Sequence, residues 1–577
     1  MAASGTAAAA VAAAAAMAPA YEALAHDIKG LGVDVTFGLM SDDTALLVTT
    51  LDSIGVKFHG TRHENNAISM AEGYATSTGR LGIAIIGRGP AAANGVHGAV
   101  YASRSGARVL IIYGHTANSV PPANGFGPDT KAFNTLGMLQ VAGIPALVAT
   151  DSATARQTLA NAVAATAQGT AALLLPMNVQ FGSIPFDGKP FEATIRAGTA
   201  APVAAKPARA AAVAAAAEIL KHSRKPLLVA GLGAYRAGAR EAMIALADKI
   251  GAGLATSMKA KDLFRGHPFD CGILGSFSNA GGRRLIEQAD CVVVFGAALN
   301  LRTTSYGMAL PPDIPVIQVD SVRSNIGRWF HADVALVTDA RQAAEQLSAA
   351  LPARSAADRP LHADEMRNWL AKFDFASEFE PAHTPRTMDP RSLAIELGKL
   401  LPANRNVVYD SGNFLQVVPY LPVPGPGHVR MASDFSSIGM GFGTALGYAC
   451  GTPERPTVFV VGDGSFLMNL GELETVVRED IPMVIVVMND CAYGAELHYL
   501  KMRNMPVQKS VFPDIDFAPV AAAFGFETAT VRTLDELRAL APLLAKPAGP
   551  ILLDCKINAA VAAPFLLESI EYEKRKS

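Results

Sequence analysis

A βαβ pattern lies in residues 457–490, which read "TVFVVGDGSFLMNLGELETVVREDIPMVIVVMND". An apolar run ends in a Gly-Asp-Gly turn, a segment with helical periodicity follows, and a second apolar run ends in Asn489 and Asp490. This order predicts a strand, a helix and a second, parallel strand. Asp463 and Asp490 are therefore expected at the carboxyl ends of two parallel strands, which is where such sheets bind ligands.

The Gly-Asp-Gly turn offers a site for an anion beside two carboxylates. The backbone amides of Gly464 and Ser465 begin the predicted helix and point toward an anion bound there. Protein-bound Mg²⁺ typically takes one or two carboxylates together with phosphate oxygens. The pattern thus favours a magnesium and phosphate site. The spacing also leaves open a second interpretation, in which this is a βαβ turn with incidental acidic residues.

Similar alternation of strands and helices extends along most of the chain. Apolar runs such as "RVLIIYG" and "ADCVVVFGA" are separated by helical patterns, which predicts parallel sheets covered by helices on both faces. Residues 186–210 and 351–390 interrupt the alternation because they are rich in proline, alanine or polar residues, and they are interpreted as breaks between domains. The expected fold is α/β, with three doubly wound parallel-sheet domains at residues 20–185, 205–350 and 390–560.

The composition of the 577 residues argues against several classes of protein. The formal net charge is −2, so no basic surplus indicates binding to nucleic acid. Five cysteines occur without a CxxC pair, which is typical of a reducing compartment. No run reaches the ~20 apolar residues of a membrane span, and the first basic residue is Lys29, too late for a secretory signal. A cytoplasmic protein is expected, with residues 1–20 as an alanine-rich disordered extension.

The spacing of Gly-Asp-Gly and the second polar pair resembles the thiamine-diphosphate motif of the acetolactate synthase and pyruvate decarboxylase superfamily. The resemblance covers residues 20–560 and implies a pyrimidine-binding domain, a Rossmann-like middle domain and a diphosphate-binding domain, in that order. It implies that the side chains of Asp463 and Asp490 and the carbonyl of Ala492 hold Mg²⁺ on the cofactor diphosphate. Asp490 departs from the family, which usually has Asn there, and its additional charge is expected to be tolerated beside the cation.

A second motif, "GTRHENNAISMAEGYATSTG" at residues 60–79, resembles the RHE-x-x-A-x-x-MAEGYA pattern of the same family. Its periodicity predicts a helix with Ala67 and Tyr74 on a buried stripe and Glu64 at its start. A glutamate in a first helical turn is ordinarily a cap or a dipole partner. The resemblance implies instead that Glu64 is the catalytic glutamate, which hydrogen-bonds the aminopyrimidine ring and promotes formation of a C2 ylide that attacks a carbonyl.

The resemblance also assigns cofactor contacts around the Gly-Asp-Gly turn. The family places a bulky apolar residue 25 positions before the metal-binding Asp, which is Ile438 here. The Ser436 carbonyl is expected to meet the pyrimidine amino group. Ser411 and Asn413, in "YDSGNF", are candidates to donate to the diphosphate, together with Gly464 and Ser465.

The substrate-binding residues combine two patterns of the superfamily. In the pyruvate decarboxylase-like pattern, Asp42 and Glu496 match acidic residues, whereas the histidine pair of that pattern is missing and His115 is a lone candidate. In the acetolactate synthase-like pattern, Arg302 matches an arginine at the active-site entrance, but Asn134 stands where Gln is expected and Tyr499 where Trp is expected. The resemblance thus gives catalytic candidates and substrate-facing candidates as two sets: Asp42, His115 and Glu496, and Asn134, Arg302, His498 and Tyr499.

The predicted function is a 2-oxo acid decarboxylase or carboligase that uses thiamine diphosphate and Mg²⁺. The alternative is a carbon–carbon lyase or ligase that acts on 2-hydroxyketones or 2-hydroxyacyl-CoA. FAD or ADP in the middle domain stays open, because the Gly-x-Gly turn at residues 231–233 lacks the third glycine of a dinucleotide site. In this superfamily the Glu64 domain of one subunit meets the Asp463 domain of another, so the resemblance implies a homodimer or homotetramer.

Overall fold

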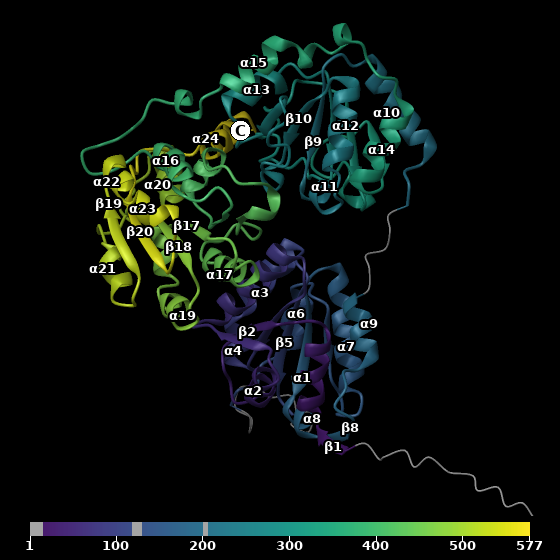
Figure 1. The fold of residues 1–577 in the computed structure, drawn as a ribbon, viewed down its shortest axis with the longest axis vertical. Helices are drawn as coiled ribbons and strands as arrows, with labels where there is room; N and C mark the ends of the chain where they lie inside the picture. The colour runs from purple at the N-terminus through teal and green to yellow at the C-terminus, as the bar shows by residue number, and fades with distance from the viewer. Residues whose placement is uncertain (1–15, 118–129, 200–205, 577) are drawn as a thin grey trace, which may run out of the picture. The chain divides into compact units, whose positions relative to one another are not determined.

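The computed structural model describes residues 16–117, 130–199 and 206–576. The chain divides into two compact units, an N-terminal unit of residues 1–202 and a C-terminal unit of residues 203–577. The N-terminal unit contains one six-stranded parallel sheet and the C-terminal unit contains two (Figure 1). This confirms the predicted α/β fold with three doubly wound parallel sheets.

The sheet of the N-terminal unit, the N-terminal sheet, has the strand order β3-β2-β4-β5-β7-β6. The chain places β3 on one side of β2 and the remaining strands on the other, so the order reverses between β2 and β4. Its strands are β2 Val35–Gly38, β3 Lys57–Gly60, β4 Gly82–Ile86, β5 Val109–His115, β6 Ala146–Val148 and β7 Ala171–Pro176. Its helices are α1 Ala20–Gly30, α2 Ala45–Ser53, α3 Glu64–Thr78, α4 Pro90–Asn94, α5 Val96–Ser105, α6 Thr135–Val141, α7 Ala155–Ala165 and α8 Met177–Phe181.

Helices cover both faces of the N-terminal sheet because strand side chains alternate between its faces. Ile83 and Ile112 of the central strands pack with Leu24 of α1, Leu51 of α2 and Leu159 of α7 in one buried cluster. Helices α3 and α5 pack against each other, and α3 also contacts β2 and β4. The predicted buried stripe of α3 is confirmed, and the burial continues around the helix from Asn66 to Ala75.

Two segments of the N-terminal unit are more ordered than the sequence suggested. Residues Ala16–Pro19 form strand β1, which pairs antiparallel with β8 Ser183–Phe186, so the predicted disorder of residues 1–20 is wrong at these positions. Residues 1–15 lie outside the described residues. Residues Glu192–Thr199 form helix α9 inside a segment that was interpreted as a domain break. The Arg108 guanidinium fixes this helix by donating to two carbonyls at its end, at 3.0 and 3.4 Å.

The first sheet of the C-terminal unit, the middle sheet, has the order β11-β10-β9-β12-β13-β14, which is the strand order of dinucleotide-binding folds. Helices α10, α12 and α14 cover one side, and α13 and α15 lie on the other (Figure 1). Its strands are β9 Pro226–Ala230, β10 Gly253–Thr256, β11 Asp270–Ile273, β12 Cys291–Phe295, β13 Val316–Asp320 and β14 Val334–Val337. Its helices are α10 Ala210–His222, α11 Leu232–Arg236, α12 Arg240–Ile250, α13 Ala280–Ile286, α14 Ala340–Ala350 and α15 Asp364–Lys372.

The segment at residues 351–390 covers the middle sheet instead of forming an open linker. Leu361 and Met366 join the buried cluster on one face of that sheet. The Trp369 indole nitrogen donates to the Gly281 carbonyl at 2.9 Å and thereby fixes α15 against α13. The polar composition of this segment hides a few apolar anchors, and these anchors decide its structure.

The second sheet of the C-terminal unit, the C-terminal sheet, has the order β16-β15-β17-β18-β20-β19. This is the same order as in the N-terminal sheet, and it reverses between β15 and β17. Its strands are β15 Asn406–Tyr409, β16 Val429–Met431, β17 Thr457–Gly462, β18 Met483–Asn489, β19 Glu527–Val531 and β20 Ile551–Lys556. Its helices are α16 Pro390–Leu400, α17 Gly441–Gly451, α18 Asp463–Leu467, α19 Glu472–Arg478, α20 Gly494–Lys501, α21 Phe517–Ala522, α22 Leu534–Ala539, α23 Ala541–Ala545 and α24 Pro564–Lys576.

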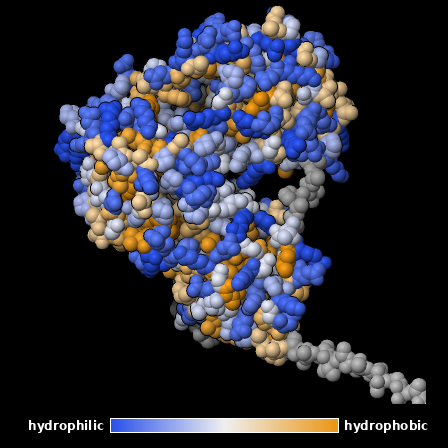
Figure 2. Space-filling model, viewed as in Figure 1, coloured by the Kyte–Doolittle hydropathy of each residue, from blue (hydrophilic) through white to orange (hydrophobic). Residues whose placement is uncertain are grey.

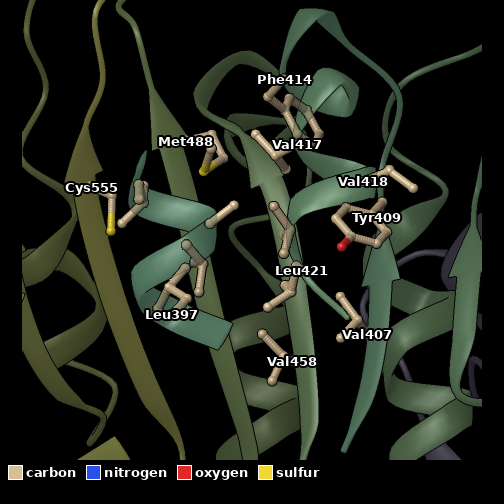
Figure 3. Close-up of a cluster of buried hydrophobic side chains, with 14 of the residues drawn as sticks. Leu397, Val407, Tyr409, Phe414, Val417, Val418, Leu421, Val458, Met488 and Cys555 are labelled. Carbon is tan, nitrogen blue, oxygen red and sulfur yellow. The ribbon is translucent and has the colours of Figure 1, made fainter. Parts of the chain in front are cut away.

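A buried cluster holds one face of the C-terminal sheet against α16 and the 3₁₀ segment Asn413–Tyr420 (Figure 3). Leu397 of α16 and Val417 of the 3₁₀ segment lie over Val458 of β17 and Met488 of β18. Apolar side chains therefore fix the ends of these strands, and the polar residues that follow them are carried at one edge of a rigid sheet.

The two sheets of the C-terminal unit contact each other through apolar side chains, such as Phe277 and Phe565, and through polar groups. Lys259, which follows β10, forms an ion pair with Asp434, which follows β16. The Arg302 guanidinium donates to the Phe565 carbonyl of α24 at 2.9 Å. On the surface in view, hydrophobic residues are interspersed among hydrophilic ones (Figure 2). Among the described helices, none is both long enough and apolar enough to cross a membrane.

Candidate active site

The C-terminal sheet brings Asp463 and Asp490 to the same edge. Strands β17 and β18 pair in parallel, with Gly462 opposite Met488. Asp463 is the first residue of α18 and is 3% exposed, and Asp490 follows β18 directly. The βαβ unit predicted from residues 457–490 is therefore confirmed, although its helical part is divided into α18 and α19.

The electrostatics of this pair fit a bound cation. Burial raises the pKa of Asp463 and of Asp490, and the negative charge of Asp463 raises the pKa of Asp490 further. The backbone amides of Gly464, Cys491 and Ala492 face Asp463 and act in the opposite direction. Two carboxylates that disfavour each other's charge are stabilised together by a divalent cation.

The protein side chains at this edge supply only part of a coordination shell. In the described parts of the chain, no group of three or more His, Cys, Asp or Glu side chains could hold a metal ion. A cation between Asp463 and Asp490 thus needs carbonyl oxygens or ligand oxygens as well, which is the usual arrangement for Mg²⁺ beside phosphate. The residues present fit a magnesium diphosphate.

The loop after β18 is held rigidly. Cys491 has a left-handed backbone with φ of 57°, which is uncommon outside glycine. Ala492 forms a bridge with Val511, and the Phe512 amide donates to the Cys491 carbonyl at 2.9 Å. A Cβ atom on Gly494 would lie 2.6 Å from the Asp490 carboxylate. The position of Asp490 is thus fixed on both sides, while Asn489 points inward and donates to Asp554 at 2.9 Å.

Two of the predicted diphosphate donors have other partners in the structure. The Asn413 side chain donates to the Val561 carbonyl at 2.9 Å and accepts from the Ala563 amide at 2.8 Å. The Ser465 hydroxyl donates to Asp410 and accepts from the Gly439 amide. The side chains of both residues therefore connect parts of the fold, whereas Ser411 is partly buried and its contact with the diphosphate stays a prediction.

Ile438 and Ser436 lie in the loop between β16 and α17. Ile438 is half-buried, whereas Ser436 is exposed and has a left-handed backbone with φ of 54°. Sequence reasoning did not identify Asp410, which is 0% exposed and accepts from the Gly439 amide at 3.0 Å. The signal available in the sequence was an acidic residue directly after a predicted strand, the same signal that identified Asp463.

Helix α20 separates three predicted substrate contacts onto two faces. Glu496 and Tyr499 are three residues apart and exposed, with Tyr499 at 48%. His498 lies on the opposite, buried face, and burial lowers the pKa of its imidazole. The spacing thus places Glu496 and Tyr499 together and His498 behind them. Arg302 engages α24 through the Phe565 ring and carbonyl, and its position at the active-site entrance stays a prediction.

In the N-terminal unit, Glu64 is the first residue of α3 and is 5% exposed. The ring nitrogen Nδ1 of His63 caps this helix by accepting from the Asn65 amide at 3.1 Å. The side-chain nitrogen of Asn94, at the end of α4, donates to Oε2 of Glu64 at 3.3 Å. Sequence reasoning did not identify Asn94, because the contact joins two helices that are 30 residues apart.

Glycines allow α4 and α5 to approach the start of α3. A Cβ atom on Gly95 would lie 3.5 Å from the Glu64 Cβ, and the Gly98 amide donates to the Asn65 side chain at 2.8 Å. The run "PAAANGVHGA" therefore carries the only local sign of this packing, since its small residues indicate a close helix contact.

The acidic pair after β2 has one exposed member and one buried member. Asp42 is exposed and forms an ion pair with Lys131 at 2.6 Å, and the hydrogen bond from Lys131 holds its pKa below the usual range. Asp43 is 1% exposed and accepts from the Arg88 amide at 2.8 Å. Asp42 is thus exposed and ion-paired, its contact with a substrate stays a prediction, and Asp43 connects the ends of β2 and β4.

His115 and Asn134 are the remaining predicted contacts in this unit. His115 is the last residue of β5 and is partly buried. Asn134 caps helix α6 by accepting from the Gly137 amide at 2.8 Å. The structure thus assigns Asn134 a local role at the helix start, and its contact with a substrate stays a prediction.

Comparison with known protein families gives the class of this chain. Residues 18–135 match the N-terminal TPP binding domain of thiamine pyrophosphate enzymes, residues 213–347 match their central domain, and residues 410–555 match their C-terminal TPP binding domain. All three matches follow in the order that the resemblance implied. The chain belongs to the thiamine pyrophosphate enzymes related to acetolactate synthase.

Several named proteins are similar over nearly the whole chain. A sulfoacetaldehyde acetyltransferase of Alcaligenes xylosoxydans is 28% identical, over 91% of this chain and 89% of that protein. A probable 2-ketoarginine decarboxylase of Pseudomonas aeruginosa is 29% identical, over 89% and 90%. A probable acetolactate synthase large subunit of Methanocaldococcus jannaschii is 24% identical, over 94% and 93%. The chain is thus a thiamine-pyrophosphate-dependent lyase or transferase.

Proposed function

We propose that this enzyme is a 2-oxo acid decarboxylase or carboligase that requires thiamine diphosphate and Mg²⁺. The observation that carries the proposal is the pair Asp463 and Asp490 beside the Gly-Asp-Gly turn, where burial raises the pKa of both carboxyl groups and the charge of Asp463 raises the pKa of Asp490 further. One similar protein is named as a decarboxylase of a keto acid and another as an acetolactate synthase, which supports this reaction class within the family.

The proposed cation site uses the Asp463 and Asp490 carboxylates and the Ala492 carbonyl. The amides of Gly464 and Ser465 and the Ser411 hydroxyl are proposed to face the diphosphate. A divalent cation offsets the repulsion between the two carboxylates and the repulsion between Asp490 and the phosphates. Because the side chains at this edge carry negative charge, we expect diphosphate affinity to depend strongly on the cation.

Bound thiamine diphosphate supplies a nucleophilic carbon for addition to a carbonyl and an electron sink for the bond that breaks beside it. Glu64 is proposed to hold and transfer a proton at Oε1. Asn94 donates to Oε2 and is proposed to fix the carboxyl plane, so that Oε1 stays directed away from α4. The low exposure of Glu64 limits competition from water for this proton.

The remaining site residues are proposed to select and protonate the substrate. Asp42, His115 and Glu496 are proposed proton donors or acceptors, and Tyr499 shares the exposed face of α20 with Glu496. Asn134 is proposed as a polar contact. We place His498 behind this face, as a support for α20, and Arg302 as a clamp on α24, since the structure shows both side chains engaged in those positions.

The structure gives no support for FAD or ADP at the Gly-x-Gly turn of the middle sheet. The Gly231 amide donates to the Phe295 carbonyl at 2.8 Å, and the Gly233 amide donates to the Gly296 carbonyl at 3.0 Å. These are the groups that would otherwise bind a phosphate. The proposal therefore includes no nucleotide at this turn, and absorbance of the purified protein near 450 nm is the direct check for a flavin elsewhere.

A homodimer or homotetramer is part of the proposal. Apolar side chains are exposed close to the Gly-Asp-Gly turn, namely Leu467, Met468, Tyr493 and Val511. These side chains are proposed to lie at an interface between copies of the chain. Light scattering of the purified protein is expected to give a mass of two or four chains, and an active monomer would contradict this part of the proposal.

The test is release of CO₂ from a panel of 2-oxo acids with thiamine diphosphate and Mg²⁺ present, with products identified by NMR. Cofactor-dependent CO₂ from at least one acid is expected. Glu64→Gln is expected to lower the rate about 100-fold or more, as for loss of a general acid–base group. Asn94→Ala is expected to lower it about tenfold, as for loss of one hydrogen bond to a charged group.

The matched control is Glu345→Gln, an exposed glutamate of α14 that pairs with Arg341 on the same helix and is expected to leave the rate unchanged. Absence of CO₂ from every acid, with cleavage of 2-hydroxyketones or 2-hydroxyacyl-CoA instead, would establish the lyase or ligase alternative. Activity that survives Glu64→Gln would contradict the role assigned to Glu64.

A further inference from the structure

Asp410 is a buried carboxylate at the point where the strand order of the C-terminal sheet reverses. It follows β15, and β15 lies between β16 and β17. The side chain is 0% exposed. None of the proposed steps uses Asp410, and a buried carboxylate is costly unless several donors satisfy it.

The donors to Asp410 come from three separate segments. At the end of β15, the Ser411 amide donates to Oδ1 at 2.7 Å. From the loop before α17, the Gly439 amide donates to Oδ2 at 3.0 Å, and the amide of Gly441, the first residue of α17, also donates. From α18, the Ser465 hydroxyl donates to Oδ2. Each of these segments carries a residue proposed to face the cofactor, namely Ser411, Ile438 and Ser465.

The loop that carries Ile438 is fixed at the very next residue. The Gly439 amide donates to Asp410 and also to the Ser465 hydroxyl oxygen, at 3.0 Å in both cases. The Gly439 carbonyl accepts from the Asn469 side chain at 3.1 Å. A Cβ atom on Gly441 would lie 2.8 Å from the Asp410 Cβ, so glycine permits this close approach.

The Ser465 hydroxyl already makes two hydrogen bonds within the fold. Its hydrogen is donated to Asp410, and its oxygen accepts the Gly439 amide. A hydroxyl has one donor, so the side chain has no hydrogen left for a phosphate oxygen. Ser465 thus has only its backbone amide to offer to an anion at the start of α18.

The N-terminal sheet, which has the same strand order, contains a similar arrangement. Asp43 follows β2, is 1% exposed and accepts from the Arg88 amide, which follows β4. Strands β2 and β4 are the pair between which that order reverses. In both sheets a buried aspartate thus connects the ends of the two strands that flank the reversal, which is where such sheets bind ligands.

We propose that Asp410 is a positioning residue that joins the three cofactor-facing segments, and that the Ser465 side chain serves Asp410 while only its amide serves the diphosphate. The proposal rests on the proposed function, because it takes thiamine diphosphate to bind at this edge. The carboxylate fixes the geometry before the cofactor arrives. Binding therefore does not have to supply the free energy needed to order the loop.

The test compares Asp410→Asn with wild type in two measurements. Isothermal titration calorimetry with Mg²⁺ present gives the dissociation constant of thiamine diphosphate, and hydrogen–deuterium exchange of the cofactor-free protein reports on residues 436–441. The side-chain NH2 group of the new asparagine would face hydrogen-bond donors that the carboxylate accepts in wild type. We therefore expect about 10- to 100-fold weaker binding of thiamine diphosphate and faster exchange at the Gly439 amide. Ser465→Ala removes one of the connections, and we expect about fivefold weaker binding with faster exchange at the same amide.

Asp27→Asn is the matched control. Asp27 is also 0% exposed and is also held by several donors, including Arg156 at 2.6 Å and the Phe191 amide at 2.6 Å, but it contacts none of the proposed cofactor residues. We expect it to lower stability and leave the dissociation constant within about twofold of wild type. An equal loss of affinity in Asp27→Asn would show that Asp410 acts only through general stability.

The outcomes separate this proposal from the proposed function. Failure of the wild type to bind thiamine diphosphate would overturn both. Binding by wild type with the same affinity and the same exchange in Asp410→Asn would overturn the positioning role alone. If Asp410→Asn does not fold, Ser465→Ala decides: unchanged exchange at Gly439 in the cofactor-free protein would show that the hydroxyl does not hold the loop.

Discussion

The middle sheet and the C-terminal sheet both place a glycine turn after a central strand, but the two turns use their polar groups differently. In the middle sheet, the amides of Gly231 and Gly233 donate to backbone carbonyls at the end of β12 and directly after it. A Cβ atom on Gly231 would lie 2.1 Å from the Gly296 carbonyl oxygen. In the C-terminal sheet, the turn carries Asp463, whose carboxylate lies beside Asp490 at a charged edge.

A glycine turn alone therefore does not indicate a ligand site. The middle turn needs glycine because two backbone segments touch, so its amides are satisfied within the fold. The C-terminal turn combines glycine with acidic residues whose charges are not satisfied by each other. The informative feature is thus the unfavourable pair of carboxylates, whose charges a bound cation would stabilise.

Asp463→Asn is expected to give the largest functional effect of the variants that test this comparison. Removing one of two carboxylate ligands is expected to weaken Mg²⁺-dependent binding of thiamine diphosphate by at least about 100-fold. The stability of the cofactor-free protein is expected not to fall, because one charge of an unfavourable pair is removed. Calorimetric titration and urea denaturation measure the two quantities on the same sample.

A matched variant in the same unit is Asp535→Asn, which changes an exposed residue of α22 that pairs with Arg538. It is expected to change neither quantity. Wild-type affinity in Asp463→Asn, or a marked loss of stability without cofactor, would mean that the carboxylate is structural, and the contrast between the two turns would then disappear.

Gly231→Ala is expected to give the opposite result, a loss of stability without a loss of cofactor affinity. The new methyl group meets backbone atoms of Gly296 and Ala297, which are unable to move independently of the sheet. We expect a cost of about 3 kcal/mol in the free energy of unfolding. Urea denaturation measures this cost, and the dissociation constant of thiamine diphosphate in the folded variant is expected to equal that of wild type.

Gly238→Ala provides the comparison for strain without crowding, because Gly238 has a φ of 60° and nothing within 4 Å of a Cβ atom there. A smaller cost, about 1 kcal/mol, is expected. If Gly231→Ala weakened cofactor binding while leaving stability intact, the middle turn would be a ligand site after all.

The parts of the structure that follow from local patterns were predictable from the sequence. The strands at either end of residues 457–490 are apolar runs of ordinary length, and their parallel pairing follows from the intervening helix. Glu64 begins α3 as predicted because the periodicity of the motif starts there. These features depend only on residues that are close together in the sequence, so the sequence pattern is sufficient to predict them.

The parts that depend on contacts between distant segments were not predictable in the same way. Asn94 reaches Glu64 across 30 residues, and Ser465 reaches Asp410 across 55. Helix α15 forms in a segment of polar composition because Trp369 finds the Gly281 carbonyl. In each case the hydrogen-bond partner lies on another element. Only the folded structure therefore shows which of several polar residues makes such a contact.

Asp490→Asn, the smallest change proposed, introduces the residue that the family usually has at this position. An amide oxygen still ligates a hard cation, so thiamine diphosphate affinity with Mg²⁺ is expected to stay within about tenfold of wild type. Removing one carboxylate is expected to raise the unfolding free energy of the cofactor-free protein by about 1 kcal/mol. It is also expected to weaken discrimination among divalent cations, measured by titration with Mg²⁺, Mn²⁺ and Ca²⁺. Complete loss of cofactor binding in this variant, with Asp463 intact, would show that the carboxylate of Asp490 is required in its charged form. The site at the end of β17 and β18 would then require two charged carboxylates, Asp463 and Asp490, whereas the glycine turn of the middle sheet has none.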